Sequence, residues 1–231
     1  MKLFLSMVLG VVLLAGHASA EEKKVFQTTK EKQSYSMGAD MGTRMKAQSI
    51  EVDPDAFVQG LKDALSGGKK LMTDEEIRET LTAFQKDLRE KQTERNKVLG
   101  EKNKKEGEAF LAENKKKEGV KTLPSGLQYK VIKDGTGKSP KTDDTVVCNY
   151  SGTLIDGTEF DSSYKRGEPA TFPVNQIIPG WTEALQLMKE GSKWQLFLPA
   201  DLAYGEQSTG IIGPNSALIF EVELISVKDK Q

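Results

Sequence analysis

The apolar residues of this sequence change their spacing once, near Gly119, and this change limits the possible folds more than any other feature. Before Gly119 they recur every three or four positions, which is the period of an α-helix with one buried face. After Gly119 they alternate, which is the period of a β-strand with one buried face. The sequence therefore predicts an α+β protein with an all-α N-terminal part and a C-terminal antiparallel sheet.

Four alternating apolar runs predict strands in the C-terminal part, residues 119–231. The runs are Leu127 to Val131, Val146 to Tyr150, Trp194 to Leu198 and Leu218 to Leu224. Asp156-Gly157 is typical of a tight turn, and one short helical pattern, Trp181 to Lys189, interrupts the strands. The simplest architecture that buries these residues is one antiparallel sheet curled over one short helix.

Residues 21–72 predict two short helices. Each helix carries a stripe of apolar residues on one face. These stripes are Tyr35, Met37, Met41 and Met45, and then Phe57, Leu61 and Leu65. Asp53 as N-cap and Pro54 in the first turn predict where the second helix begins, and Gly67-Gly68 predicts its end.

Residues 73–118 predict one long helix that links the two parts. Thr73 and Glu76 form a capping-box pattern, and apolar residues continue at helical spacing from Ile77 to Leu88. Beyond Leu88 the residues are mostly charged, which is typical of a helix that crosses solvent. Gly100 and Gly107 each cost a helix about 1 kcal/mol relative to alanine, so we expect a bend or fraying there.

The segment before Leu88 is too short to enclose a large core by itself, yet it offers several apolar helix faces. These faces need a partner. We therefore expect a homodimer formed through residues 21–90, in which the first turns of the linker helix belong to the dimer interface.

Residues 1–20 have the three parts of a secretory signal peptide: Met1-Lys2, an apolar run, and Ala18-Ser19-Ala20 as a cleavage site. The apolar run is shorter than the roughly 18 residues that span a bilayer, and no cysteine follows it. We therefore expect an exported protein without stable membrane insertion. The periplasm is the expected compartment, with outer-membrane association or the cell surface as alternatives.

Cleavage after Ala20 removes His17, the only histidine of the chain, and leaves Cys148 as the single cysteine. A Ser-His-Asp or Cys-His nucleophile is thereby excluded, and we expect neither a metal nor a cofactor. Cys148 lies in an alternating run and is expected to be a small buried side chain. The lysines of residues 102–121 alternate with glutamates, which predicts a solvated helix face and no nucleic-acid binding.

Five segments of the C-terminal part, in this order, resemble the FKBP family of peptidyl-prolyl cis/trans isomerases over residues 120–228. They are Val147 to Leu154, Gly157 to Ser163, Gly180-Trp181, Leu202 to Gly205 and Ala217 to Leu224. Three N-terminal segments, Ser34 to Asp40, Ala64 to Gly67 and Phe84 to Leu88, are similar to the macrophage infectivity potentiator (Mip) subgroup of exported bacterial FKBPs. In that subgroup the N-terminal segment dimerises and a long helix carries the isomerase domain.

The resemblance implies an enzyme that assists the folding of exported proteins, with proline-containing unfolded or partly folded polypeptides as partners and macrolides such as rapamycin as inhibitors. It implies an apolar pocket with Trp181 as its floor, and with walls that comprise Tyr150, Phe160, Phe172, Ile177, Ile212 and Phe220. At its edge the resemblance places three polar groups: the Asp161 carboxylate, the Tyr204 hydroxyl and the backbone N–H of Ile178.

Such a pocket suits the chemistry of the reaction. Rotation about an Xaa–Pro bond has a barrier of about 18–20 kcal/mol because amide resonance is lost, and no bond is broken. A catalyst therefore needs an apolar, water-poor pocket for the proline ring and hydrogen bonds fitted to the twisted amide.

The sequence departs from the family pattern at the rim of the pocket. Ala170 stands where many members have an aromatic residue, which Phe172 could replace, the loop after Tyr204 is short, and Gly213 stands where proline is frequent. A second function remains open: a dimeric holdase chaperone or proline-peptide binding module in which turnover is secondary. An Asp161 variant that still suppresses aggregation of a proline-free client would favour it.

Overall fold

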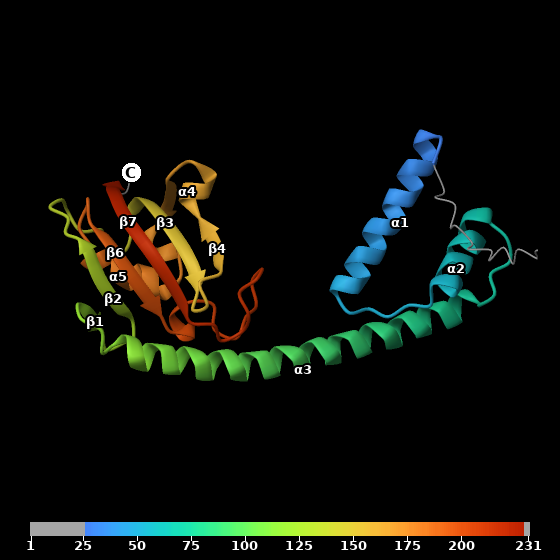
Figure 1. Ribbon diagram of the computed structural model, residues 1–231, viewed down its shortest axis with the longest axis horizontal. Helices are drawn as coiled ribbons and strands as arrows, with labels where there is room; N and C mark the ends of the chain where they lie inside the picture. The colour runs from blue at the N-terminus through green and yellow to red at the C-terminus, as the bar shows by residue number, and fades with distance from the viewer. Residues whose placement is uncertain (1–25, 229–231) are drawn as a thin grey trace, which may run out of the picture. The chain divides into compact units, whose positions relative to one another are not determined.

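The computed structural model describes residues 26–228, so the predicted signal peptide lies outside the described residues. The chain divides into two compact units between Thr73 and Asp74. Each unit is described by itself below, and both appear in Figure 1.

The first unit contains two helices, α1 (Thr29–Ala47) and α2 (Pro54–Ser66). The Asp53 carboxylate accepts hydrogen bonds from the first backbone N–H groups of α2, which confirms Asp53 as its N-cap. Gly67 ends α2 in a left-handed conformation with φ of 65°, as the Gly67-Gly68 pattern predicts.

The apolar stripes of α1 and α2 stay largely exposed within residues 26–228, although the Tyr35 ring packs against Phe26 with centroids 4.8 Å apart. Neither helix contains a buried residue. Leu65 and Met37 are 79% and 73% exposed, and Tyr35 and Leu61 are more than half exposed. Two exposed apolar helix faces of this kind mark an interaction surface.

The second unit begins with α3 (Asp74–Asn114), a helix of 41 residues that is roughly 60 Å long at about 1.5 Å per residue. It ends slightly before the predicted end of the linker. The helix is continuous through Gly100 and Gly107, so neither glycine frays it. Both glycines are buried, which indicates that they serve packing.

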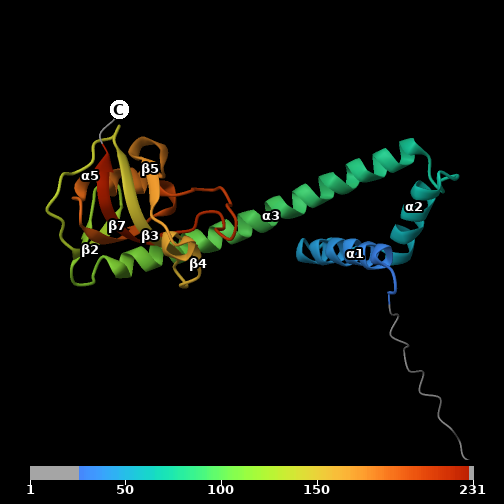
Figure 2. The ribbon, with the colours of Figure 1, turned by 90° about the horizontal axis from the view of Figure 1, so that it is seen from above.

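The C-terminal half of α3 lies alongside the sheet (Figures 1 and 2). The ring centroids of Phe110 and Phe197 are 6.1 Å apart. The Gln128 side chain accepts a hydrogen bond from Asn114 Nδ2 at 3.0 Å and donates one to the Leu111 carbonyl oxygen at 2.9 Å. The expectation that the helix crosses solvent beyond Leu88 is therefore wrong for these last turns.

The sheet has seven antiparallel strands in the order β1-β2-β6-β7-β3-β4, and β5 pairs with β3 outside this path. The strands are β1 (Val120–Thr122), β2 (Gln128–Lys133), β3 (Thr145–Leu154), β4 (Glu159–Ser162), β5 (Ala170–Pro173), β6 (Lys193–Leu198) and β7 (Leu218–Lys228). β3 and β7 pair along almost their whole length, so they form the centre of the sheet.

The core lies between this sheet and helix α5 (Pro179–Leu187), as the sequence predicts. Alternate residues of β3 and β7 are buried, including Val146, Cys148, Phe220 and Val222. The sequence predicts one helical interruption, but the structure also has α4 (Ser163–Arg166) and two short 3-10 turns, Val174–Gln176 and Ala200–Leu202. Elements of three or four residues are too short to show a period in the sequence.

Candidate active site

A cavity of about 820 Å³ opens between α5, the inner faces of β3 and β7, and the loop that precedes β7. Its lining is mostly aromatic and aliphatic. The lining residues are Tyr150, Phe160, Asp161, Phe172, Gln176, Ile177, Ile178, Trp181, Tyr204, Thr209, Gly210, Ile211, Ile212 and Phe220. A volume of this size is typical of a site for a small molecule or a few residues of a peptide.

Trp181, in the first turn of α5, is 4% exposed and has three aromatic neighbours. Its ring meets those of Tyr150, Phe172 and Phe220 nearly at right angles, with centroids 5.2, 5.8 and 5.3 Å apart. Edge-to-face contacts of this geometry are favourable because the positive ring edge faces the negative ring face. The four rings therefore hold each other in place as one apolar surface.

Gly152 leaves space for the Phe160 and Phe220 rings, which line the cavity, to contact each other. The Phe160 and Phe220 rings stand edge to face with centroids 5.5 Å apart. A Cβ atom added to Gly152 would lie 2.6 Å from Phe160 and 2.8 Å from Phe220. Because real Cβ atoms do not approach other atoms so closely, only glycine fits there.

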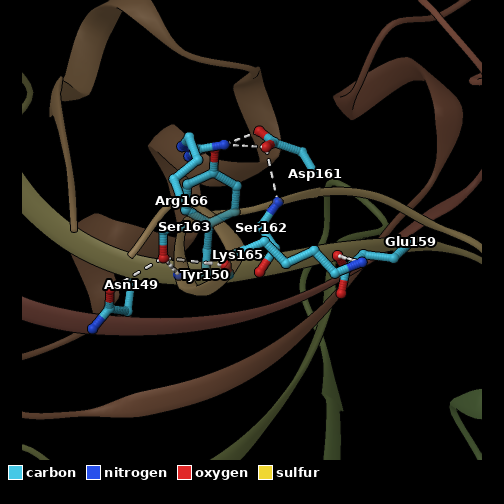
Figure 3. A network of polar contacts seen from close by, with 8 residues as sticks. All are labelled: Asn149, Tyr150, Glu159, Asp161, Ser162, Ser163, Lys165 and Arg166. Atoms are coloured by element: carbon cyan, nitrogen blue, oxygen red, sulfur yellow. Dashed lines mark hydrogen bonds and ion pairs between the residues drawn. The ribbon is translucent and has the colours of Figure 1, made fainter. Parts of the chain in front are cut away.

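A network of three polar side chains lies at the edge of the cavity (Figure 3). The Tyr150 hydroxyl donates a hydrogen bond to Asp161 Oδ2, and the Arg166 guanidinium forms an ion pair with Oδ1 of the same carboxylate. Arg166 Nη2 also donates to the Tyr150 hydroxyl at 2.7 Å, and the guanidinium lies over the Tyr150 ring. Asp161 is thereby held in one orientation.

The network controls the ionisation of its two acids. Burial alone would raise the pKa of Asp161, but hydrogen bonds from Tyr150 and Arg166, together with the charge of Arg166, lower it below 3.8. Burial and the hydrogen bond to Asp161 raise the pKa of Tyr150 above 10.0. At neutral pH the site therefore contains a carboxylate and a neutral phenol.

Helix α4 carries Arg166 and is joined to β3 by a buried serine. Ser163 Oγ accepts a hydrogen bond from the Tyr150 backbone N–H at 2.9 Å and donates one to Asn149 Oδ1 at 3.1 Å. Ser163 is fully buried. This contact places the helix, and with it Arg166, next to the Tyr150 ring.

Tyr204 and Ile178, which carry the other two predicted polar groups, also line the cavity. The Tyr204 side chain is half-buried, and Ile178 is the N-cap residue of α5. Within residues 26–228, neither the Tyr204 hydroxyl nor the Ile178 backbone N–H has a hydrogen-bond partner. Both donors are therefore available to a bound peptide.

The ten site residues that the sequence predicts all line this one cavity. Phe172 takes part in the wall, whereas Ala170 is not among the lining residues. The sequence reasoning missed Arg166, which follows the acid by five residues on a helix too short to recognise. It also missed Gln176, Thr209 and Ile211 on the rim.

Two further features limit the chemistry in the part of the chain that the structure describes. No group of three or more His, Cys, Asp or Glu side chains between residues 26 and 228 could hold a metal ion. Cys148 is fully buried on β3, and burial raises the pKa of its thiol to about 12. The thiol is therefore protonated and inert.

Comparison with known proteins gives two family matches. Residues 136–225 match the model of the FKBP-type peptidyl-prolyl cis-trans isomerase, and residues 30–131 match the domain amino terminal to that isomerase. A protein of Legionella longbeachae, "Outer membrane protein MIP", is 50% identical over 229 residues, which cover 99% of this chain and 98% of the relative. This chain belongs to the FKBP family. It is a peptidyl-prolyl cis-trans isomerase.

Two more relatives agree with this assignment. The peptidyl-prolyl cis-trans isomerase Mip of Coxiella burnetii is 48% identical over 231 residues, which cover 100% of this chain and 100% of that relative. The crystal structure of FkpA from Escherichia coli matches with a TM-score of 0.65 and 40% identity, over 88% of this chain and 99% of that one. The FKBP fold and the Mip-like resemblance are both confirmed, while the domain boundaries near residues 72 and 118 stay predictions.

Helix α3, the longest helix within residues 26–228, is strongly charged. None of the helices between residues 26 and 228 combines the length and the apolar character that a membrane crossing requires.

Proposed function

We propose that this isomerase binds the proline ring against Trp181 and twists the preceding amide beside Asp161. The observation that carries the proposal is the set of three aromatic rings that pack on Trp181, with one oriented carboxylate at the edge. An apolar surface of this kind favours the twisted amide, which is less polar than the planar one.

In the proposed reaction the polar groups bind the twisted state. The Tyr204 hydroxyl and the Ile178 N–H donate hydrogen bonds to substrate carbonyl oxygens, and the Asp161 carboxylate stabilises the amide during rotation. Phe160, Phe172, Ile177 and Ile212 surround the ring and exclude water. No proton transfer is needed, because rotation about the bond breaks no covalent bond.

The experiment that tests these roles compares Asp161→Leu with the native protein in a protease-coupled assay of an Xaa-Pro peptide. We expect kcat/KM to fall at least about tenfold, which corresponds to about 1.4 kcal/mol of barrier. Asp156→Asn, which removes a carboxylate from the neighbouring hairpin turn, is the control and should retain full activity. Unchanged turnover in folded Asp161→Leu would refute the role of the acid.

We also propose that the protein is a homodimer through residues 21–90. The stripes on α1 and α2, and Leu81 and Phe84 on α3, support this because they are apolar and exposed in the part of the single chain that the structure describes. Sedimentation equilibrium should give the dimer mass at micromolar concentration. Leu61→Glu should shift the protein to monomer, and the exposed Leu187→Glu of the isomerase domain should not.

The proposed location of the mature protein is the periplasm, with the outer membrane or the cell surface as alternatives. The signal-peptide pattern of residues 1–20 supports export, and the name of the Legionella relative supports an outer-membrane location for that protein. Fractionation of cells followed by immunoblotting would separate the three compartments. Recovery of the full-length chain in the cytoplasm would contradict export.

The expected clients are proline-containing, partly folded polypeptides, and macrolides are expected to compete for the same cavity. A macrolide such as rapamycin should inhibit peptide turnover competitively if it occupies the floor at Trp181. The holdase function remains the second candidate, because the exposed stripes of α1 and α2 could bind unfolded chains. Suppression of aggregation by Asp161→Leu, combined with its loss in Leu61→Glu, would favour that second function.

A further inference from the structure

The loop between Tyr204 and β7 forms one wall of the cavity and reaches over to helix α3. At its tip, Thr209 and Ile212 exchange two backbone hydrogen bonds of 2.9 Å each. Ile212 is 4% exposed and lines the cavity, whereas residues 206–211 are exposed. Because the tip is poorly packed, its position depends on the base of the loop.

The base of the loop is closed by a backbone contact. The Asn215 N–H donates a hydrogen bond of 2.7 Å to the Gly205 carbonyl oxygen. Gly205 directly follows Tyr204, so the same contact ties the tyrosine to the turn at Gly213 to Ser216. Any displacement of this turn is therefore transmitted to both sides of the loop.

Helix α3 holds this turn from outside the isomerase sheet. Asn103 Nδ2 donates a hydrogen bond to the Pro214 carbonyl oxygen at 2.9 Å and lies 3.3 Å from Ser216 Oγ. Ser216 Oγ in turn donates to the Gly213 carbonyl oxygen at 2.9 Å. Asn103 therefore contacts the turn at two residues, Pro214 and Ser216, with one amide group.

The helix and the turn approach each other closely at position 213. A Cβ atom added to Gly213 would lie 2.8 Å from Asn103 Nδ2 and 3.1 Å from a Leu99 methyl carbon. The helix and the turn are thus fitted to each other in this chain.

We propose that Asn103 is a positioning residue for prolyl isomerisation: from α3 it holds the Gly213–Ser216 turn, and through the turn it places Ile212 against the proline ring. The linker helix is then part of the active-site structure in addition to a connection between domains.

The proposal predicts which kinetic constant changes. This inference rests on the proposed function, in which Ile212 contacts the proline ring in the ground state and in the transition state alike, so a displaced Ile212 weakens the binding of both states equally. We expect Asn103→Ala to raise KM about three- to tenfold while kcat changes less than about twofold. A merely structural role would lower the folded fraction, and hence the apparent kcat, without changing KM.

The experiment uses the full mature chain and four variants. Asn103→Ala removes the amide, and Asn103→Asp keeps the shape but replaces the Nδ2 donor by an oxygen. Ser216→Ala breaks the turn from its other side. Asn96→Ala is the matched control on the same helix, because within residues 26–228 the Asn96 side chain forms a hydrogen bond with Gln92 in the preceding turn and none with the isomerase sheet or its loops. The first three should raise KM, and the control should not.

Amide hydrogen exchange measured by NMR gives a readout besides activity. The Ile212 N–H, which bonds to the Thr209 carbonyl oxygen, should exchange at least about fivefold faster in Asn103→Ala and at the native rate in Asn96→Ala. Native KM and native exchange at Ile212 in folded Asn103→Ala or Asn103→Asp would overturn the proposal. If neither folds, the same two measurements on Ser216→Ala decide it.

Discussion

The Tyr150 hydroxyl donates a hydrogen bond to the Asp161 carboxylate, so the acid at the edge of the pocket is held by one of the pocket's own aromatic walls. Arg166 contacts both partners from α4. The orientation of the acid and the shape of the apolar surface are therefore coupled. A change in either partner should affect both binding and rotation.

Removal of Arg166 tests this coupling. Arg166→Ala should lower kcat/KM about three- to tenfold, because Asp161 loses its ion pair and the Tyr150 ring loses the guanidinium that covers it. The neighbouring Lys165, which pairs with Glu159 at 2.7 Å, provides the control. Lys165→Ala should keep native kinetics, and an equal loss in both variants would show that only general charge matters.

The pH dependence of turnover follows from the same network. The folded pKa of Asp161 lies below 3.8 and that of Tyr150 above 10.0, so neither group titrates between these values. We expect kcat/KM to vary less than about twofold between about pH 5.5 and 8.5. A bell-shaped profile centred in this range would contradict the assignment.

The lowered pKa of Asp161 also predicts how stability changes at acidic pH. Because the folded pKa of Asp161 is lowered, its ionised form stabilises the fold above the unfolded pKa, and this stabilisation is lost as pH falls through the folded value. In Arg166→Ala the folded pKa should rise. Asp161 should then titrate at higher pH in that variant, which carboxyl chemical shifts from NMR would measure.

Two glycines of α3 make a matched pair for the packing of the helix on the sheet. A Cβ atom at Gly107 would lie 2.9 Å from Ala217 Cβ, which is attached directly to the backbone and cannot turn away. At Gly100 it would lie 3.2 Å from Asn215 Nδ2, the end of a flexible side chain. Helix propensity favours alanine by about 1 kcal/mol at both positions, so only the contact differs.

We therefore expect Gly107→Ala to lower the free energy of unfolding by about 1–2 kcal/mol and Gly100→Ala to leave it within about 0.5 kcal/mol or raise it. Urea denaturation of the two variants, followed by tryptophan fluorescence, measures both values. Equal gains in stability would mean that α3 does not pack on the sheet at Gly107.

Gly152 makes a similar prediction for the pocket itself. Gly152→Ala should push the Phe160 and Phe220 rings into the cavity and cost about 1–3 kcal/mol of stability through overpacking. Turnover of an Xaa-Pro peptide should fall with the narrower pocket. The control is Ser151→Ala, because Ser151 is the neighbouring residue on the strand and points to the other face of the sheet. Native activity in Gly152→Ala would show that the Phe160 and Phe220 rings can move apart.

The alternation of apolar residues allowed the sheet to be predicted, whereas the pocket was predicted from the resemblance to the FKBP family, with which the alternation agrees. Alternation places Tyr150 and Phe220 on the inner face, and both line the cavity. Asp161 follows Phe160 directly, so the acid and one wall come from the same short segment.

The contacts of α3 with the sheet domain could not be predicted from the same patterns, because they join residues far apart in the sequence. Asn103 lies among charged residues, and its partners at Pro214 and Ser216 are more than a hundred positions away. One signal was available: Gly100 and Gly107 are seven positions apart and therefore share a helix face. The free-energy cost of glycine in a helix suggested fraying at these two positions. In the structure both glycines lie where the helix packs closely on the sheet domain.

The buried thiol of Cys148 makes the native chain suited to spectroscopic labelling. Cys148 is the only cysteine, it is fully buried, and its pKa of about 12 leaves almost no thiolate at neutral pH. A cysteine introduced at an exposed position such as Lys69 should therefore be the only one to react with a maleimide dye or a nitroxide. Pulsed electron resonance between two such labels would measure distances across the proposed dimer without altering the core.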